Sequence, residues 1–285
     1  MKKYTSIGQL LKDYRSINKQ TRVDLAAAFD VDTRTVSRWE KNETLLKPDK
    51  EEEMVDITFI PYQVIRNLNA PVAIPVYYDF DLRKYSISEF SNELPDANWL
   101  KSVYNLQTDR IKAISTDEDI EYVVRSSMTQ ASVSKPITKE IILKATSLLP
   151  ELNFIIYDTS GYYSGHSIYF PLKRSTYNKI KNREIKEEDI TIDDFVDCNS
   201  IDNPVFFSFD ISSDCNETLF YVSAALTKFF KSFNRDYTYA SITSRHDNFK
   251  INEQLGTTLV WEDKELQKQL KSKAAPRLYE NNRKF

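Results

Sequence analysis

Residues 6–44 read SIGQLLKDYRSINKQTRVDLAAAFDVDTRTVSRWEKNET. Apolar side chains recur at helical spacing in the first part of this stretch, which predicts an amphipathic helix over residues 6–17. Thr21 is a suitable N-cap for a short second helix, and Asp32 is suitable for a third helix over residues 33–41. Three short helices within about forty residues are typical of tri-helical DNA-binding modules.

The third expected helix has two different faces. Val36 and Trp39 fall on the side that would face inward, while Thr33, Arg34 and Arg38 fall on the outer side. This helix can therefore pack on the other two and still present cationic side chains outward.

The same stretch resembles the repressor-type helix-turn-helix family known as XRE. Leu25-Ala26, Val31, Val36 and Trp39-Glu40 stand at that family's pattern positions. The resemblance implies an all-α DNA-binding domain that places the N-terminal end of its third helix in the major groove.

The resemblance also implies roles for individual side chains. Thr33, Arg34 and Arg38 would read base edges, and arginine suits this role because its fork can donate two hydrogen bonds to guanine. Arg22 and Ser37 would contact phosphates.

Two further residues match a structural pair of the family, and two positions depart from its pattern. Arg15 and Glu40 match a salt bridge that ties the first helix to the third. Arg22 stands where the family usually has Gln, and Asp30 stands where it usually has Gly, at a turn that favours left-handed backbone. A three-helix bundle that binds only protein is the alternative interpretation.

The charge distribution favours the DNA-binding interpretation. The 285-residue chain has a net charge of −3, yet residues 1–50 carry 11 Lys or Arg and 7 Asp or Glu, a local charge of +4 that leaves −7 for the rest. A basic module on an acidic body suits attraction to phosphates. No apolar run approaches the ~20 residues of a membrane span, and no signal region is evident, so we expect a soluble, cytoplasmic protein without a membrane partner.

The length favours more than one domain. We expect the helix-turn-helix domain over residues 1–70, and a hairpin and linker over residues 71–110. The hairpin would be formed by residues 74–79 and 84–88.

Residues 111–262 alternate between helical and strand patterns, which predicts an α/β (α+β) layered domain. We expect residues 263–285, which are highly charged, to form a tail helix. The expected helices of the layered domain span residues 116–128, 138–148, 175–182, 217–233 and 245–255, and its expected strands span 153–158, 166–171, 205–212, 237–242 and 257–261.

The order of these elements resembles the GNAT acetyltransferase fold. The strongest local similarities are GHSIYFPLK at residues 165–173, the strand–helix unit at 205–233, and residues 248–256 followed by a strand. The resemblance implies a site for acetyl-CoA, whose pyrophosphate would lie on a glycine-containing loop at a helix N-terminus.

Two features speak against robust acetyl transfer. The equivalent loop, SSDCNET at residues 212–218, contains no glycine, and its Asp214 and Glu217 add negative charge where phosphates would lie. The family's general-acid tyrosine aligns with Asn252, which cannot donate a proton in that role. We therefore disfavour acetyl-CoA as a cofactor and expect no catalytic residues.

Other chemical sites have weaker support. His166 could act as a base with Asp158 or Glu151, but a lone histidine in a strand is more often structural. Cys215 heads an expected helix beside acidic neighbours, so we expect it to be unreactive. Cys198 and Cys215 cannot form a zinc site alone, the two histidines are far apart, and the acidic run at 187–194 lacks calcium-loop spacing, so no metal site is expected.

These observations favour a sequence-specific transcriptional regulator that binds double-stranded DNA as a homodimer. The GNAT-like domain would dimerise the protein or sense a small-molecule or protein effector. The alternatives are an active acyl-CoA-dependent N-acetyltransferase that carries a DNA-binding module, and an antitoxin-like interaction protein.

Overall fold

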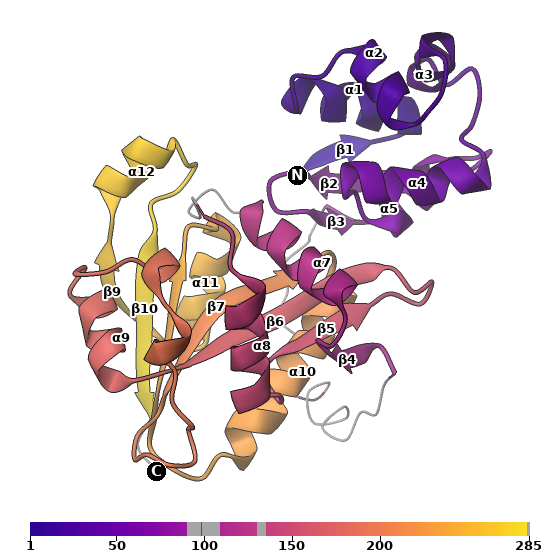
Figure 1. Cartoon of the computed structure of the whole chain (residues 1–285). Coiled ribbons are helices and arrows are strands. Elements are labelled where there is room, and N and C mark those ends of the chain that lie inside the picture. Colours follow the sequence, from indigo (N-terminus) through magenta and orange to yellow (C-terminus); the bar gives the residue numbers. More distant parts are fainter. Residues whose placement is uncertain (90–97, 99–108, 130–134, 284–285) are drawn as a thin grey trace. The chain divides into compact units, whose positions relative to one another are not determined.

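The computed structural model describes residues 1–89, 98, 109–129 and 135–283. The chain divides into two compact units (Figure 1): unit 1 comprises residues 1–93 with 214–216, and unit 2 comprises the remainder. Residues 90–97 and 99–108 of the expected linker lie outside the described residues.

Unit 1 contains helices and a small sheet. Its sheet has the order β1-β2-β3 and is antiparallel. The helices are α1 (Ile7–Ile17), α2 (Arg22–Ala28), α3 (Thr33–Glu40), α4 (Pro48–Thr58) and α5 (Tyr62–Leu68), and the strands are β1 (Lys2–Tyr4), β2 (Val76–Asp79) and β3 (Lys84–Ser86).

Side-chain caps explain where the first three helices begin. Ser6 accepts a hydrogen bond from the backbone N–H of Gln9, and Thr21 forms a reciprocal capping box with Asp24. Asp32 accepts from the backbone N–H of Arg34 at the start of α3. Because caps satisfy amide groups that have no partner within the helix, they set the helix boundaries that the sequence predicts.

A glycine allows α1 and α3 to approach closely. A Cβ atom on Gly8 would lie 2.6 Å from the backbone oxygens of both Trp39 and Glu40. The backbone N–H of Gly8 donates to Oδ1 of Asn42 at 2.9 Å. The end of α3 is therefore fixed directly against α1.

The hairpin that we expected beside the linker is an integral part of unit 1. β2 pairs with β1 in the register Tyr4↔Val76 and Lys2↔Tyr78. Tyr4, Val76 and Tyr78 are all buried. Three residues of β1 are too few to show an alternating pattern, so the sequence did not indicate this strand.

Unit 2 is a mixed α/β structure built on a seven-stranded sheet of order β4-β5-β6-β7-β8-β10-β9. β7 and β8 are parallel, and the other neighbours are antiparallel. The strands are β4 (Ile111–Ala113), β5 (Phe154–Tyr157), β6 (Tyr163–Leu172), β7 (Val205–Ser213), β8 (Tyr237–Thr243), β9 (Thr258–Glu262) and β10 (Arg277–Arg283).

The helices of unit 2 cover both faces of the sheet. Figure 1 shows α7 and α8 on the face opposite to α10. The helices are α7 (Asp117–Met128), α8 (Lys139–Leu148), α9 (Arg174–Lys181), α10 (Asn216–Ser232), α11 (His246–Gln254) and α12 (Lys264–Leu270), with short 3-10 turns η1 (Glu187–Asp189) and η2 (Ile192–Asp194).

An aromatic cluster packs α10 on the sheet. Phe206 of β7 is fully buried and contacts Phe229, Phe230 and Phe233 edge-to-face at centroid distances of 5.1–5.6 Å. Edge-to-face aromatic packing adds to the stabilisation from apolar burial. This cluster accounts for the helical spacing of phenylalanines near the end of α10.

The prediction of a tail helix over residues 263–285 was wrong in its second half. Within the described residues 263–283, only residues 264–270 are helical, and β10 inserts between β8 and β9. Leu278 and Tyr279 are buried in the sheet. The residues around this pair are charged or carry amides, so the sequence of β10 lacks the alternation of apolar and polar residues that predicts a strand. The strand is buried because β8 and β9 pair with its two edges. No helix in the described parts of the chain is long and apolar enough to span a membrane.

Candidate functional site

The outer face of α3 presents the residues that the sequence singled out for base reading. Thr33, Arg34 and Arg38 are exposed, and Ser37 is partly exposed beside them. Among the described residues, the guanidinium groups of Arg34 and Arg38 have no ion pair. Two solvated cations on one helix face can form contacts with an external polyanion without first breaking internal ones.

A buried carboxylate supports this helix from behind. Glu40, at the end of α3, is fully buried, and its Oε1 accepts from Nε of Arg15 at 2.8 Å. Its Oε2 accepts from Nε of Arg22 at 2.7 Å. The first contact is the salt bridge that the resemblance implied, and the second adds α2 to the same carboxylate.

The charge of Glu40 is maintained by its two partners. Burial alone would raise the pKa of this carboxyl group, but hydrogen bonds and charge attraction from Arg15 and Arg22 hold the pKa below its usual value. Arg22 remains about half exposed while it donates to Glu40. It therefore has donor capacity left on the side facing solvent.

The turn between α2 and α3 has the backbone shape that the sequence implied. Asp30 adopts a φ of 48°, in the left-handed region. Asp is one of the few residues besides glycine that tolerates this conformation. The substitution of Asp for the family's glycine is therefore compatible with the turn.

In unit 2, the acid at the start of α10 is neutralised within the protein. Glu217 accepts from Nη1 of Arg110 at 2.7 Å, and the Arg110 guanidinium lies 4.6 Å from the ring centroid of Tyr221. The resemblance to the GNAT fold implied that the negative charge of Glu217 lies where the pyrophosphate of acetyl-CoA would bind. The structure pairs that charge with a cation from the segment before β4.

Asn252, at the position where the resemblance implied a tyrosine, forms hydrogen bonds within the protein. Its Nδ2 donates to the backbone oxygen of Asn248 at 3.0 Å, and its Oδ1 accepts from Ser241 at 3.3 Å. The side chain is buried on α11. An amide in two internal hydrogen bonds suits helix docking better than proton transfer.

A buried polar chain crosses β6 and β7. His166 is inaccessible to solvent, with Nδ1 2.6 Å from the hydroxyl oxygen of Tyr163 and Nε2 3.0 Å from Oδ2 of Asp210. Asp158, one of the two acids considered from the sequence as a partner, instead accepts hydrogen bonds from the backbone of its own turn, at Ser160 and Tyr162. Asp210 is adjacent only through strand register, which the sequence pattern does not reveal.

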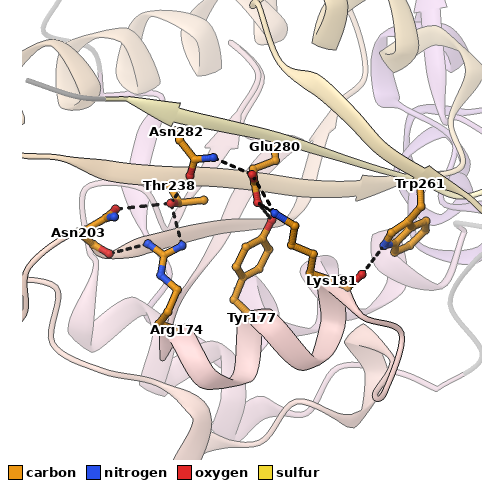
Figure 2. A network of polar contacts seen from close by, with 8 residues as sticks. All are labelled: Arg174, Tyr177, Lys181, Asn203, Thr238, Trp261, Glu280 and Asn282. Atoms are coloured by element: carbon orange, nitrogen blue, oxygen red, sulfur yellow. Dashed lines mark hydrogen bonds and ion pairs between the residues drawn. The ribbon is translucent and has the colours of Figure 1, made fainter.

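A second polar network fixes α9 to the sheet (Figure 2). Glu280 of β10 accepts from the hydroxyl of Tyr177, from Nζ of Lys181 at 2.9 Å, and from Nδ2 of Asn282 at 2.7 Å. Burial would raise the pKa of Glu280, but these donors lower it below the ordinary value. Figure 2 shows the donors converging from α9 and the strand itself.

The same network continues to β8. Nη1 of Arg174 donates to Oγ1 of Thr238 at 2.9 Å, while its Nη2 donates to the backbone oxygen of Asn203 at 2.8 Å. Oγ1 of Thr238 donates to Oδ1 of Asn282 at 2.7 Å. Every side chain in this network has an internal partner, so it acts as a rigid support for α9.

Neither of the two cysteines forms a disulfide with the other. Cys198 is buried in the aromatic core, where burial raises its pKa, and Cys215 is partly exposed just before α10. A raised pKa keeps the thiol of Cys198 protonated. In the described parts of the chain, no group of three or more His, Cys, Asp or Glu side chains is arranged to hold a metal.

Comparison with known proteins gives limited information. No family model and no curated protein matches this chain. Several solved structures share part of its arrangement. Ard1 from Thermoplasma volcanium has 14% identity and a TM-score of 0.37, and the alignment covers 60% of this chain and 95% of that one.

Two other structures are similar at the same level. The C-terminal condensation domain of Ebony in complex with beta-alanyl-dopamine has 9% identity and a TM-score of 0.31, covering 66% of this chain and 96% of that one. The histone acetyltransferase HPA2 and related acetyltransferase from Corynebacterium glutamicum has 10% identity and a TM-score of 0.30, covering 60% and 93%. Similarity this low carries no argument about activity.

Proposed function

We propose that this chain is a sequence-specific DNA-binding transcriptional regulator that acts as a homodimer. Unit 1 binds double-stranded DNA through α3. Unit 2 serves as the dimerisation or ligand-sensing body. A single recognition helix reads only a few base pairs, so two copies on a two-fold site are needed for useful specificity.

The observation that carries this proposal is the exposed face of α3. Arg34 and Arg38 are exposed and form no ion pair with any described residue, on a helix that Glu40 fixes to α1 and α2. Arginine on a rigid helix can donate a bidentate pair of hydrogen bonds to guanine in the major groove. Arg22, partly exposed at the start of α2, is suited to a phosphate contact that adds affinity without sequence preference.

The test compares the specific and non-specific DNA binding of one double variant and one single variant. The preferred site is first selected from a random pool of double-stranded DNA. Arg34→Ala/Arg38→Ala should lose about 30-fold or more in preference for that site, since each of the two bidentate pairs contributes about 1–3 kcal/mol of discrimination. Arg22→Ala should instead weaken binding to all sequences equally and reduce the salt dependence.

The matched control is Lys228→Ala/Lys268→Ala, which removes the same charge from exposed positions of unit 2. Its site preference should equal that of the unchanged chain. If the arginine variant also retains full site preference, α3 does not read bases. If the pool yields no enriched sequence, sequence-specific DNA binding is refuted.

The alternative is that unit 2 is an acyl-CoA-dependent N-acetyltransferase. The observation that favours it is the parallel pair β7–β8, whose pairing is confined to residues 205–208 and 238–241 while β7 continues to Ser213. Ligands of α/β sheets bind beyond the carboxyl ends of such strands. Calorimetry with coenzyme A decides: saturable binding with acetyl-CoA turnover would support the enzyme, and absence of binding would exclude it.

A further inference from the structure

One face of the sheet in unit 2 bears a pocket of about 430 Å³. Its floor is formed by Phe170 of β6 and Phe209 of β7. Its walls are formed by residues 135–138, just before α8, by 140 and 141 in the first turn of α8, and by 187–192, around η1. A volume of this order accommodates a small organic molecule. The wall at 187–192 belongs to the long connection between β6 and β7.

A β-bulge forms the floor of the pocket. Ile168 pairs with Asp210 and Tyr169 pairs with Ser208, which leaves Phe209 as the extra residue of β7. The ring of Phe209 is partly exposed and stacks on Phe170 at a centroid distance of 4.5 Å. A β-bulge changes the direction in which a side chain points, and here the bulge places the ring of Phe209 in the lining of the pocket.

The walls of the pocket are strongly acidic. Among the described residues that line it, Lys135 is the only cation, and its Nζ lies 3.9 Å from Asp189 in an exposed pair. Glu188 has an outward partner in Lys186 at 3.8 Å. The lining carboxylates are those of Glu140, Glu187, Glu188 and Asp189.

Glu187 differs from the other acids of the pocket. Among the described residues, its carboxyl group has no ion pair and no side-chain hydrogen bond. Glu187 is partly exposed, and desolvation by the surrounding protein, followed by the negative charges of Asp210 and Glu188, raises its pKa to about 8. A positive charge placed against this carboxyl group would reverse that effect and favour its ionised form.

We infer that this pocket binds a small organic cation, a primary ammonium group on a short apolar or aromatic stem. The ammonium would lie against Glu187 and the ring of Phe209, since aromatic faces attract cations. The stem would contact Phe170, Ile137, Ile141 and Ile190, which supply the apolar part of the lining. This site does not depend on the DNA-binding proposal.

Benzylamine and pentylamine are suitable probes, and benzyl alcohol is the neutral match for the first. Isothermal titration of the full chain at pH 7.5 should show saturable binding of at least one amine, with benzyl alcohol at least about tenfold weaker. Glu187→Gln should lower the affinity for the amine about tenfold, which corresponds to the loss of one charge contact. Glu253→Gln, an exposed acid on α11, should have no effect.

A proton count provides a second, independent readout. Titrations in two buffers of different ionisation enthalpy should show protons released when the amine binds, because bound cation converts Glu187 to its carboxylate. The other groups near it are Glu188, Asp189, Glu140, Lys135 and the Asp210–His166 pair, all of which remain in the Gln variant. Release should disappear in Glu187→Gln. Failure of both amines to bind, or equal binding of benzyl alcohol, overturns the inference.

Discussion

The absence of a side chain at Gly8 determines how closely α1 and α3 can pack. Gly8→Ala places a methyl group 2.6 Å from two backbone oxygens that cannot rotate away. We expect a loss of about 1–3 kcal/mol in the stability of unit 1, typical of overpacking. Hydrogen exchange of residues 7–40 measures it, and Ser16→Ala, an exposed site on α1, should change little. Equal protection in the two variants would contradict this packing.

Glu40 gives unit 1 a specific dependence on pH. Since its pKa is lowered on folding, its contribution to stability is complete above the unfolded pKa and is lost as pH falls through the folded pKa. Glu40→Gln should cost about 1–3 kcal/mol at pH 7, and the cost should shrink below about pH 4. Urea unfolding at pH 7 and pH 3.5 checks this. Glu43→Gln, an exposed acid, should differ little from the unchanged chain at either pH.

At the scale of elements, α9 depends on β10 for its position. Glu280→Ala would leave Lys181 and Tyr177 without their acceptor. We expect about 1–3 kcal/mol less stability, because the buried hydroxyl of Tyr177 and the partly exposed ammonium of Lys181 would lose their acceptor. Hydrogen exchange should increase in α9 and remain unchanged in β5. Glu265→Ala on α12 is the exposed control, and a uniform change across unit 2 would argue against a local role.

Local signals explain which elements could be predicted. Thr21, Asp32 and Thr116 cap helices through bonds spanning two or three residues, so the starts of α2, α3 and α7 could be read from the sequence. The bond from Tyr177 to Glu280 spans 103 residues, and no local pattern indicates it. The same holds for His166 and Asp210, which lie 44 residues apart in the sequence.

The contact between Glu40 and Arg22 could be predicted only in part. The resemblance indicated Arg15, but it assigned Arg22 to phosphate and not to Glu40. Both roles are compatible, because Nε of Arg22 is engaged and its side chain is still about half exposed. An arginine in place of the family's glutamine is the signal that could have indicated a second partner for the buried acid.

At the scale of the whole molecule, the boundary of unit 1 moves from the expected residue 70 to the end of the hairpin. A fragment of residues 1–70 lacks β2 and β3 and exposes the buried side of Tyr4. We expect residues 1–89 to unfold cooperatively at a temperature several degrees above that of residues 1–70. Equal melting temperatures by circular dichroism would show that the hairpin is dispensable.

Because β10 lies between β8 and β9, this part of the sheet can form only after the C-terminal residues have been synthesised. Residues 237–262 leave the exit tunnel before residues 277–283, so β9 has no strand beside it until β10 arrives. During that interval, the backbone edge of β8 lacks its later partner and is open to pairing with other chains. Slow translation of the segment between β9 and β10 would therefore prolong the period in which nascent chains are most prone to aggregate.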